Sequence, residues 1–253
     1  MADQPTNPAA EPFDYVPRMP GESDPARMAM VMSRLRSAAH TDLSPRRENL
    51  RDLADTVRLL IGRLAHTDAP DDVIEEATAR LGAIAGLFAD HGQKSVYGFS
   101  EMATSGGDHA VIFDHSPLIG LANPLAPPMT LTVENEVVIA SVTFTEAYEG
   151  PPGCVHGGYV AAAFDEVLGA AQSFSGAPGM TGTLTVRYES PTPLQTELRY
   201  EGRLVGVERR KIFTEGRCYA GDRLTATAKG TFIALNPGTF LDLIAERARQ
   251  PTP

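Results

Sequence analysis

The chain has 253 residues, 42% of them hydrophobic, and carries a formal charge of −10 at pH 7. That length can bury a substantial core, and an acidic chain without a long lysine or arginine block is not expected to bind nucleic acid. The chain shows neither a basic-then-apolar start nor an apolar run of about eighteen residues, so we expect no membrane partner and a cytoplasmic location.

The first part of the chain has no strand pattern. Residues 1–22 are rich in proline, alanine and acids without an apolar period, so we expect a disordered tail there. Residues 23–94 are predicted to form a helical module. Ser23 suits the N-cap of a helix at about 24–40, and apolar residues share one face in the segments at about 44–64 and 70–92. Such apolar stripes are typical of packing or oligomer surfaces, and no chemical group is evident in them.

The second part has a strand pattern, and we assign it to one domain over residues 95–240 with a C-terminal tail at 241–253. Two extended runs meet at Asn135-Glu136, and further runs follow at about 181–190, 196–206, 211–221 and 223–235. In "TELRYEGRL" apolar and charged residues alternate, which predicts one dry and one wet face. We therefore predict an antiparallel meander.

One long apolar helix begins near Gly157 and can cover the dry face of this sheet. The fold class is therefore α+β, with an antiparallel sheet wrapped around one central helix. The two cysteines, Cys154 and Cys218, lack the spacing of a zinc site, and we expect no metal and no redox cofactor.

The central helix and its flanks carry a specific set of residues. A "GPPGxxHGG" loop precedes the helix, Asp165 lies nine residues after His156, Thr181 begins the next strand, and that strand ends in "YxxPxP". Over about residues 110–236 these features resemble the hotdog-fold acyl-CoA thioesterases of the phenylacetate-degradation type. The resemblance implies a hotdog fold, here with an N-terminal all-helical extension, and acyl-CoA as the substrate.

The resemblance also implies catalytic roles. The backbone amide of Gly157 would hold the thioester carbonyl oxygen, and Asp165 would activate water or attack directly, with Thr181 nearby. Physical reasoning agrees, because free amides at a helix N-terminus suit an oxyanion and an acid among apolar residues is suited to base chemistry. No GxSxG nucleophile elbow is present, and we interpret His156 as an organiser of the loop that fixes the Gly157 amide.

Further residues are candidates for binding the substrate. Gly158 shares the helix start with the proposed oxyanion donor. The basic run Arg209, Arg210 and Lys211 is suited to the phosphates of coenzyme A, with solvation of a turn as the alternative. Glu166 lies about 100° around the helix from its acidic neighbour, and we interpret it as an exposed or interface acid.

The spacing within the helix predicts an oligomer. Eight residues separate Gly157 from Asp165, which is about 12 Å along a helix axis, whereas one attack geometry needs contacts of about 3 Å. The amide and the acid of one site are therefore expected to come from different chains of a homodimer, or of a dimer of dimers.

We predict an acyl-CoA thioesterase that releases a carboxylic acid and free coenzyme A. Two alternatives stay open. One is a hotdog dehydratase or hydratase, although a "GDxNPxH" type of motif is absent from this sequence. The other is a non-catalytic acyl-thioester binding protein that holds partners through its helical module.

Overall fold

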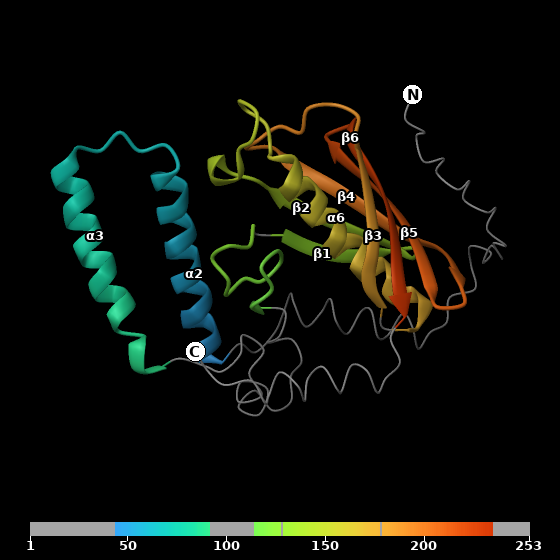
Figure 1. Ribbon diagram of the computed structural model, residues 1–253, viewed down its shortest axis with the longest axis horizontal. Helices are drawn as coiled ribbons and strands as arrows, with labels where there is room; N and C mark the ends of the chain where they lie inside the picture. Colours follow the sequence, from blue (N-terminus) through green and yellow to red (C-terminus); the bar gives the residue numbers. More distant parts are fainter. Residues whose placement is uncertain (1–43, 92–113, 128, 178, 235–253) are drawn as a thin grey trace, which may run out of the picture.

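The structure is a computed structural model that describes residues 44–91, 114–127, 129–177 and 179–234 (Figure 1). Several expectations lie outside the described residues: the tail at 1–22, the helix at 24–40, the domain boundary at residues 94–95 and the tail at 241–253.

Two of the expected N-terminal helices lie within the described residues. Helix α2 spans Pro45–Leu64 and begins after Ser44, whose hydroxyl accepts a hydrogen bond from the Arg47 amide. Helix α3 spans Asp71–Gly86 and is followed by the short helix η1 at Ala89–His91. None of the α3 side chains is buried among the described residues, and α3 lies on the far side of α2 from the sheet (Figure 1).

Within the described ranges, six antiparallel strands form one sheet in the order β1-β2-β4-β5-β6-β3. The expected plain meander is wrong in one respect, because β3 precedes β4 in the chain yet lies at the opposite edge, next to β6. The cause is helix α6, which crosses one face of the sheet between β2 and β3 and so delivers the chain to the far edge (Figure 1). The strand bounds are β1 Met129–Glu134, β2 Val137–Thr143, β3 Gly179–Tyr188, β4 Glu197–Glu208, β5 Lys211–Ala220 and β6 Arg223–Ala234.

Turn chemistry sets the register of the first hairpin. Asn135 and Glu136 join β1 to β2 with φ angles of 49° and 63°. Both values lie in the left-handed region that a two-residue hairpin turn of type I′ requires. The break between the two extended runs therefore lies where the sequence predicts it.

The core lies between the sheet and α6, which spans Gly157–Gln172. Phe164, Val167 and Leu168 of this helix are fully buried against the strands. The helix comes very close to the sheet at Gly202, where an added Cβ would lie 2.7 Å from Cγ1 of Val167. An antiparallel sheet wrapped around one long helix is the hotdog arrangement, so the predicted fold class is confirmed.

Candidate active site

A loop with internal backbone hydrogen bonds leads into α6. The Gly150 amide donates to the Cys154 carbonyl at 2.9 Å, and the His156 amide donates to the Tyr148 carbonyl at 2.8 Å. Gly150 packs so closely that an added Cβ would lie 2.7 Å from Cα of His156. The "GPPGxxHGG" sequence thus folds into a loop with fixed backbone, which places His156 at the N-cap of the helix.

The backbone amides of the first turn of α6 have unequal partners. The Gly158 amide donates to Nδ1 of His156 at 3.0 Å. The amides of Tyr159 and Val160 donate to the His156 carbonyl at 2.9 and 3.3 Å. Within the described part of the chain, the Gly157 amide alone among these four donates no hydrogen bond. A free amide at the positive end of a helix is a ready donor to an anionic oxygen.

Tyr188 lies directly against this free amide donor. Its hydroxyl donates to the Gly157 carbonyl at 2.7 Å, which ties the end of β3 to the start of α6. An added Cβ at Gly157 would lie 3.1 Å from that hydroxyl oxygen. The sequence drew attention to Tyr188 only through the "YxxPxP" pattern, and no role was expected for it.

The helix acid Asp165 lies farther along α6, where it meets the start of β3. Thr181 donates its hydroxyl hydrogen to Oδ1 of Asp165 at 2.8 Å, so these two expected site residues do lie together. Asp165 is half-buried rather than enclosed by its apolar neighbours. One carboxylate oxygen is thereby held while the carboxyl group keeps access to the surface.

The neighbouring acid, Glu166, was expected to be an exposed or interface residue, and it is half-buried within the single chain rather than exposed. Burial raises the pKa of the Glu166 carboxyl; the Ser116 hydroxyl lowers it, and the nearby negative charge of Asp165 raises it further. Ser116, in the segment of residues 114–127, contacts the Glu166 side chain on this side of α6. Those residues carry no helix or strand period, so their position could not be read from the sequence.

The basic run forms the turn between β4 and β5. Arg209 has a φ of 51°, and the Arg210 guanidinium donates to the Ala234 carbonyl at 3.2 and 3.1 Å. Arg209 and Lys211 are exposed. The sheet register places Lys211 two strands away from the start of β3, where Thr181 lies. The basic turn is therefore at the Thr181 end of β3, whereas the free Gly157 amide is at the Tyr188 end.

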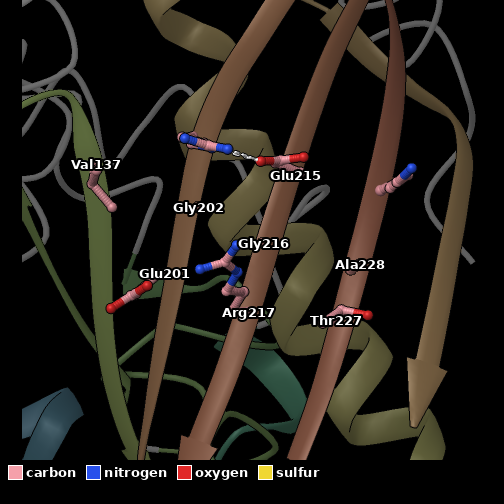
Figure 2. Close-up of a pocket in the computed structure, with 10 residues that line it drawn as sticks. Val137, Glu201, Gly202, Glu215, Gly216, Arg217, Thr227 and Ala228 are labelled. Atoms are coloured by element: carbon pink, nitrogen blue, oxygen red, sulfur yellow. Dashed lines mark hydrogen bonds and ion pairs between the residues drawn. The ribbon is translucent and has the colours of Figure 1, made fainter. Parts of the chain in front are cut away.

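A separate hollow of about 360 Å³ lies on the other face of the sheet (Figure 2). An ion pair between Arg203 and Glu215 crosses it. An added Cβ at Gly202 would point towards Val167 of α6, so its neighbours Glu201 and Arg203 face away from the helix. The hollow therefore lies on the face of the sheet that is turned away from α6. It shares no residue with the proposed site. Its lining residues are Val137, Glu201, Gly202, Arg203, Glu215, Gly216, Arg217, Thr227, Ala228 and Lys229.

Comparison with known proteins decides the family. The family model of the thioesterase superfamily matches residues 152–227, which include the loop, α6 and β3. A crystal structure described as a thioesterase superfamily protein is 33% identical, with a TM-score of 0.63. That match covers 73% of this chain and 94% of the other. The chain belongs to the thioesterase superfamily.

Curated members of the superfamily match a shorter stretch. Acyl-coenzyme A thioesterase THEM4 of Xenopus laevis is 36% identical over 91 residues, which is 35% of this chain and 41% of that protein. Acyl-coenzyme A thioesterase THEM5 of Homo sapiens is 30% identical over 98 residues, or 39% and 37% of the two chains. The chain thus spans about two fifths of the length of the curated relatives it matches.

Two features are absent from the residues that the structure describes. No group of three histidine, cysteine, aspartate or glutamate side chains among them has an arrangement that would hold a metal ion. No described helix combines the length and apolar character needed to cross a membrane.

Proposed function

We propose that this member of the thioesterase superfamily is an acyl-CoA thioesterase. One observation carries the proposal: α6 begins with the free amide of Gly157 and carries Asp165 farther along, held by the Thr181 hydroxyl. A donor for an oxyanion and an oriented carboxylate are the two groups that thioester hydrolysis needs. The naming of curated relatives as acyl-coenzyme A thioesterases supports the same reaction.

The proposed reaction uses these groups in turn. Asp165 removes a proton from water while the water oxygen attacks the thioester carbonyl carbon, and the oxygen that becomes negative accepts the Gly157 amide hydrogen. The carbon–sulfur bond then breaks, and the coenzyme A thiolate takes up the proton. In the alternative route Asp165 attacks the carbon itself, and water hydrolyses the resulting anhydride. Both routes give a carboxylic acid and free coenzyme A.

The proposed site is shared between two chains. Gly157 and Asp165 of one helix are about 12 Å apart along its axis, so a single substrate carbonyl cannot meet both. Within the described sheet, β3 is an edge strand, with β6 on one side only, and it carries Thr181 and Tyr188 at its two ends. A twofold axis beside this edge would pair two β3 strands and bring the amide of one chain towards the acid of the other.

The basic turn is the proposed contact for the phosphates of coenzyme A. Arg209 and Lys211 project from the β4–β5 turn into solvent, and Arg210 already binds the Ala234 carbonyl. Two exposed cations at the Thr181 end of β3 suit a phosphate-bearing leaving group. Gly158 is proposed to belong to the substrate-binding loop. The proposed setting is acyl-lipid metabolism in the cytoplasm.

The test is free-thiol release from acyl-CoAs of increasing chain length. We expect hydrolysis by the wild type and a fall in kcat of about 100-fold or more in Asp165→Asn, because asparagine keeps the volume but cannot act as base or nucleophile. The control is Asp222→Asn, which removes an exposed acid from the β5–β6 turn and should leave the rate unchanged. Full activity in Asp165→Asn would overturn the assignment. Binding of acyl-CoA without thiol release in the wild type would favour a binding protein.

A further inference from the structure

Helix α2 is tied to the hotdog domain by a buried charge cluster. Arg47 and Arg51, one turn apart on α2, both bind the carboxylate of Asp114, and the Arg51 contact is 2.7 Å. The Asp114 side chain is only 2% exposed. Removing the cationic partners of a buried carboxylate is strongly destabilising, because an uncompensated charge stays behind. Arg47 and Arg51 therefore hold Asp114 in place only while α2 is present.

A third arginine of α2 extends the same contact. The Arg58 guanidinium donates to four backbone carbonyls, those of Gly120, Leu121, Asn123 and Ala126, at 2.7 to 3.1 Å. Four carbonyls around one guanidinium fix the path of a segment that has no strand partner to hold it. The segment of residues 114–127 lies between α2 and α6 (Figure 1). Its shape thus depends on α2.

The held segment contacts α6 beside the proposed catalytic acid. Ser116 is buried and donates its hydroxyl hydrogen to Oε1 of Glu166 at 3.3 Å. The same hydroxyl accepts from the amides of Leu118 and Ile119 at 3.3 and 3.4 Å, so the local backbone orients it. Glu166 is adjacent to Asp165 in α6. A continuous set of contacts therefore runs from α2 through residues 114–127 to the acid pair.

We propose that α2 and the 114–127 segment together determine how far Glu166 is buried and which hydrogen bond it accepts. Glu166 is then a positioning residue that acts on catalysis through Asp165. The inference rests on the proposed function, because it gives Asp165 the role of base. It assigns a function to the helical module, in which the sequence showed no chemical group. Displacing α2 would then change catalysis without any α2 residue touching the substrate.

The charges around Glu166 define how this control works. Asp165 lies on the same helix, and the packed 114–127 segment brings Asp114, itself neutralised by Arg47 and Arg51, together with His115 next to Ser116 in the chain. Ionisation of Glu166 adds a negative charge beside Asp165, which favours proton transfer from water to the Asp165 carboxylate. We expect kcat/KM to rise about two- to five-fold as Glu166 ionises.

The test compares the pH profile of kcat/KM among variants of the full chain. Glu166→Gln should abolish the rise assigned to Glu166. Ser116→Ala should move it to higher pH, since the hydroxyl lowers the pKa of Glu166 and burial remains. The triple substitution Arg47→Gln, Arg51→Gln and Asp114→Asn loosens the segment without leaving Asp114 as an unpaired charge. It should move the rise to lower pH, because burial is the largest cause that raises the pKa of Glu166. Arg46→Gln, an exposed neighbour on α2, is the matched control and should change nothing.

Two opposite displacements separate control from simple damage. If the arginine contacts to Asp114 were merely structural, their loss would lower kcat/KM at every pH without moving the rise. That result, or an equal displacement of the rise by Arg46→Gln, would overturn the inference. Should the triple substitution unfold the chain, Arg51→Gln alone replaces it, because Arg47 then still pairs with Asp114. The Glu166 carboxyl can also be titrated directly by carbon-13 NMR in every variant. Absence of thiol release in the wild type would reject the proposed function, while an unmoved Glu166 titration in the α2 variants would reject the control by α2.

Discussion

At the scale of single residues, the hydrogen bond between Thr181 and Asp165 defines the acid of the proposed site. It joins residues 16 positions apart, one on α6 and one on β3. A hydroxyl that donates to Oδ1 restricts rotation of the carboxylate and leaves Oδ2 to face a water molecule or the substrate. At the start of α6, Nδ1 of His156 accepts the Gly158 amide hydrogen, while the Gly157 amide has no hydrogen-bond partner among the described residues.

Thr181→Val should lower kcat about ten-fold, because valine keeps the shape of threonine but loses a hydrogen bond worth about 1.4 kcal/mol in the transition state. KM should change little, since Thr181 holds the acid rather than the substrate. Thr181→Ser keeps the hydroxyl and should restore most of the rate. Steady-state thiol release measures all three proteins. Equal losses in the serine and valine variants would show that the hydroxyl does not act on Asp165.

At the scale of elements, α6 determines where both proposed catalytic groups lie. The loop before Gly157 fixes where the helix starts, and the hydrogen bond from Thr181 fixes the Asp165 carboxylate. Glycines in β4 and β5 let the helix pack closely against the sheet. At Gly202 the side chain of Val167 occupies the space that a Cβ would need. The close approach therefore depends on a residue without a side chain.

Gly202→Ala should lower the free energy of unfolding by about 1 to 3 kcal/mol, because its methyl group would lie 2.7 Å from Cγ1 of Val167 and push α6 outward. Gly62→Ala in α2 is the matched control. Nothing lies within 4 Å of its added methyl group, so it should stabilise the helix by about 0.5 to 1 kcal/mol. Urea denaturation followed by circular dichroism measures both. A neutral Gly202→Ala would mean that the helix does not need this approach.

At the scale of the whole molecule, local patterns predicted the elements and long-range contacts decided their arrangement. The α2 helix and the hairpin turn at Asn135-Glu136 follow from spacing and turn chemistry that lie within a few residues. The far-edge position of β3 and the burial of Glu166 do not, since each depends on partners distant in sequence. The Arg47–Asp114 contact spans 67 residues, and neither neighbourhood alone indicates it. Gly157, Asp165 and Thr181 were proposed from a resemblance in the loop, helix and strand start, and only the contact between Asp165 and Thr181 could be checked in the structure.

The central claim, a hydrolytic site shared by two chains, is tested most directly by complementation. Gly157→Pro removes the amide hydrogen at a helix position that tolerates proline, and Asp165→Asn removes the base, so each pure mutant dimer should be nearly inactive. Gly157→Ala keeps the amide and serves as the control for crowding of Tyr188 by the new Cβ. Both mutants must dimerise and exchange chains. An equal mixture should then regain about a quarter of the wild-type thiol release, because half the dimers are mixed and one of their two sites is intact. A mixture as inactive as its parents would place the amide and the acid in one chain and contradict the account.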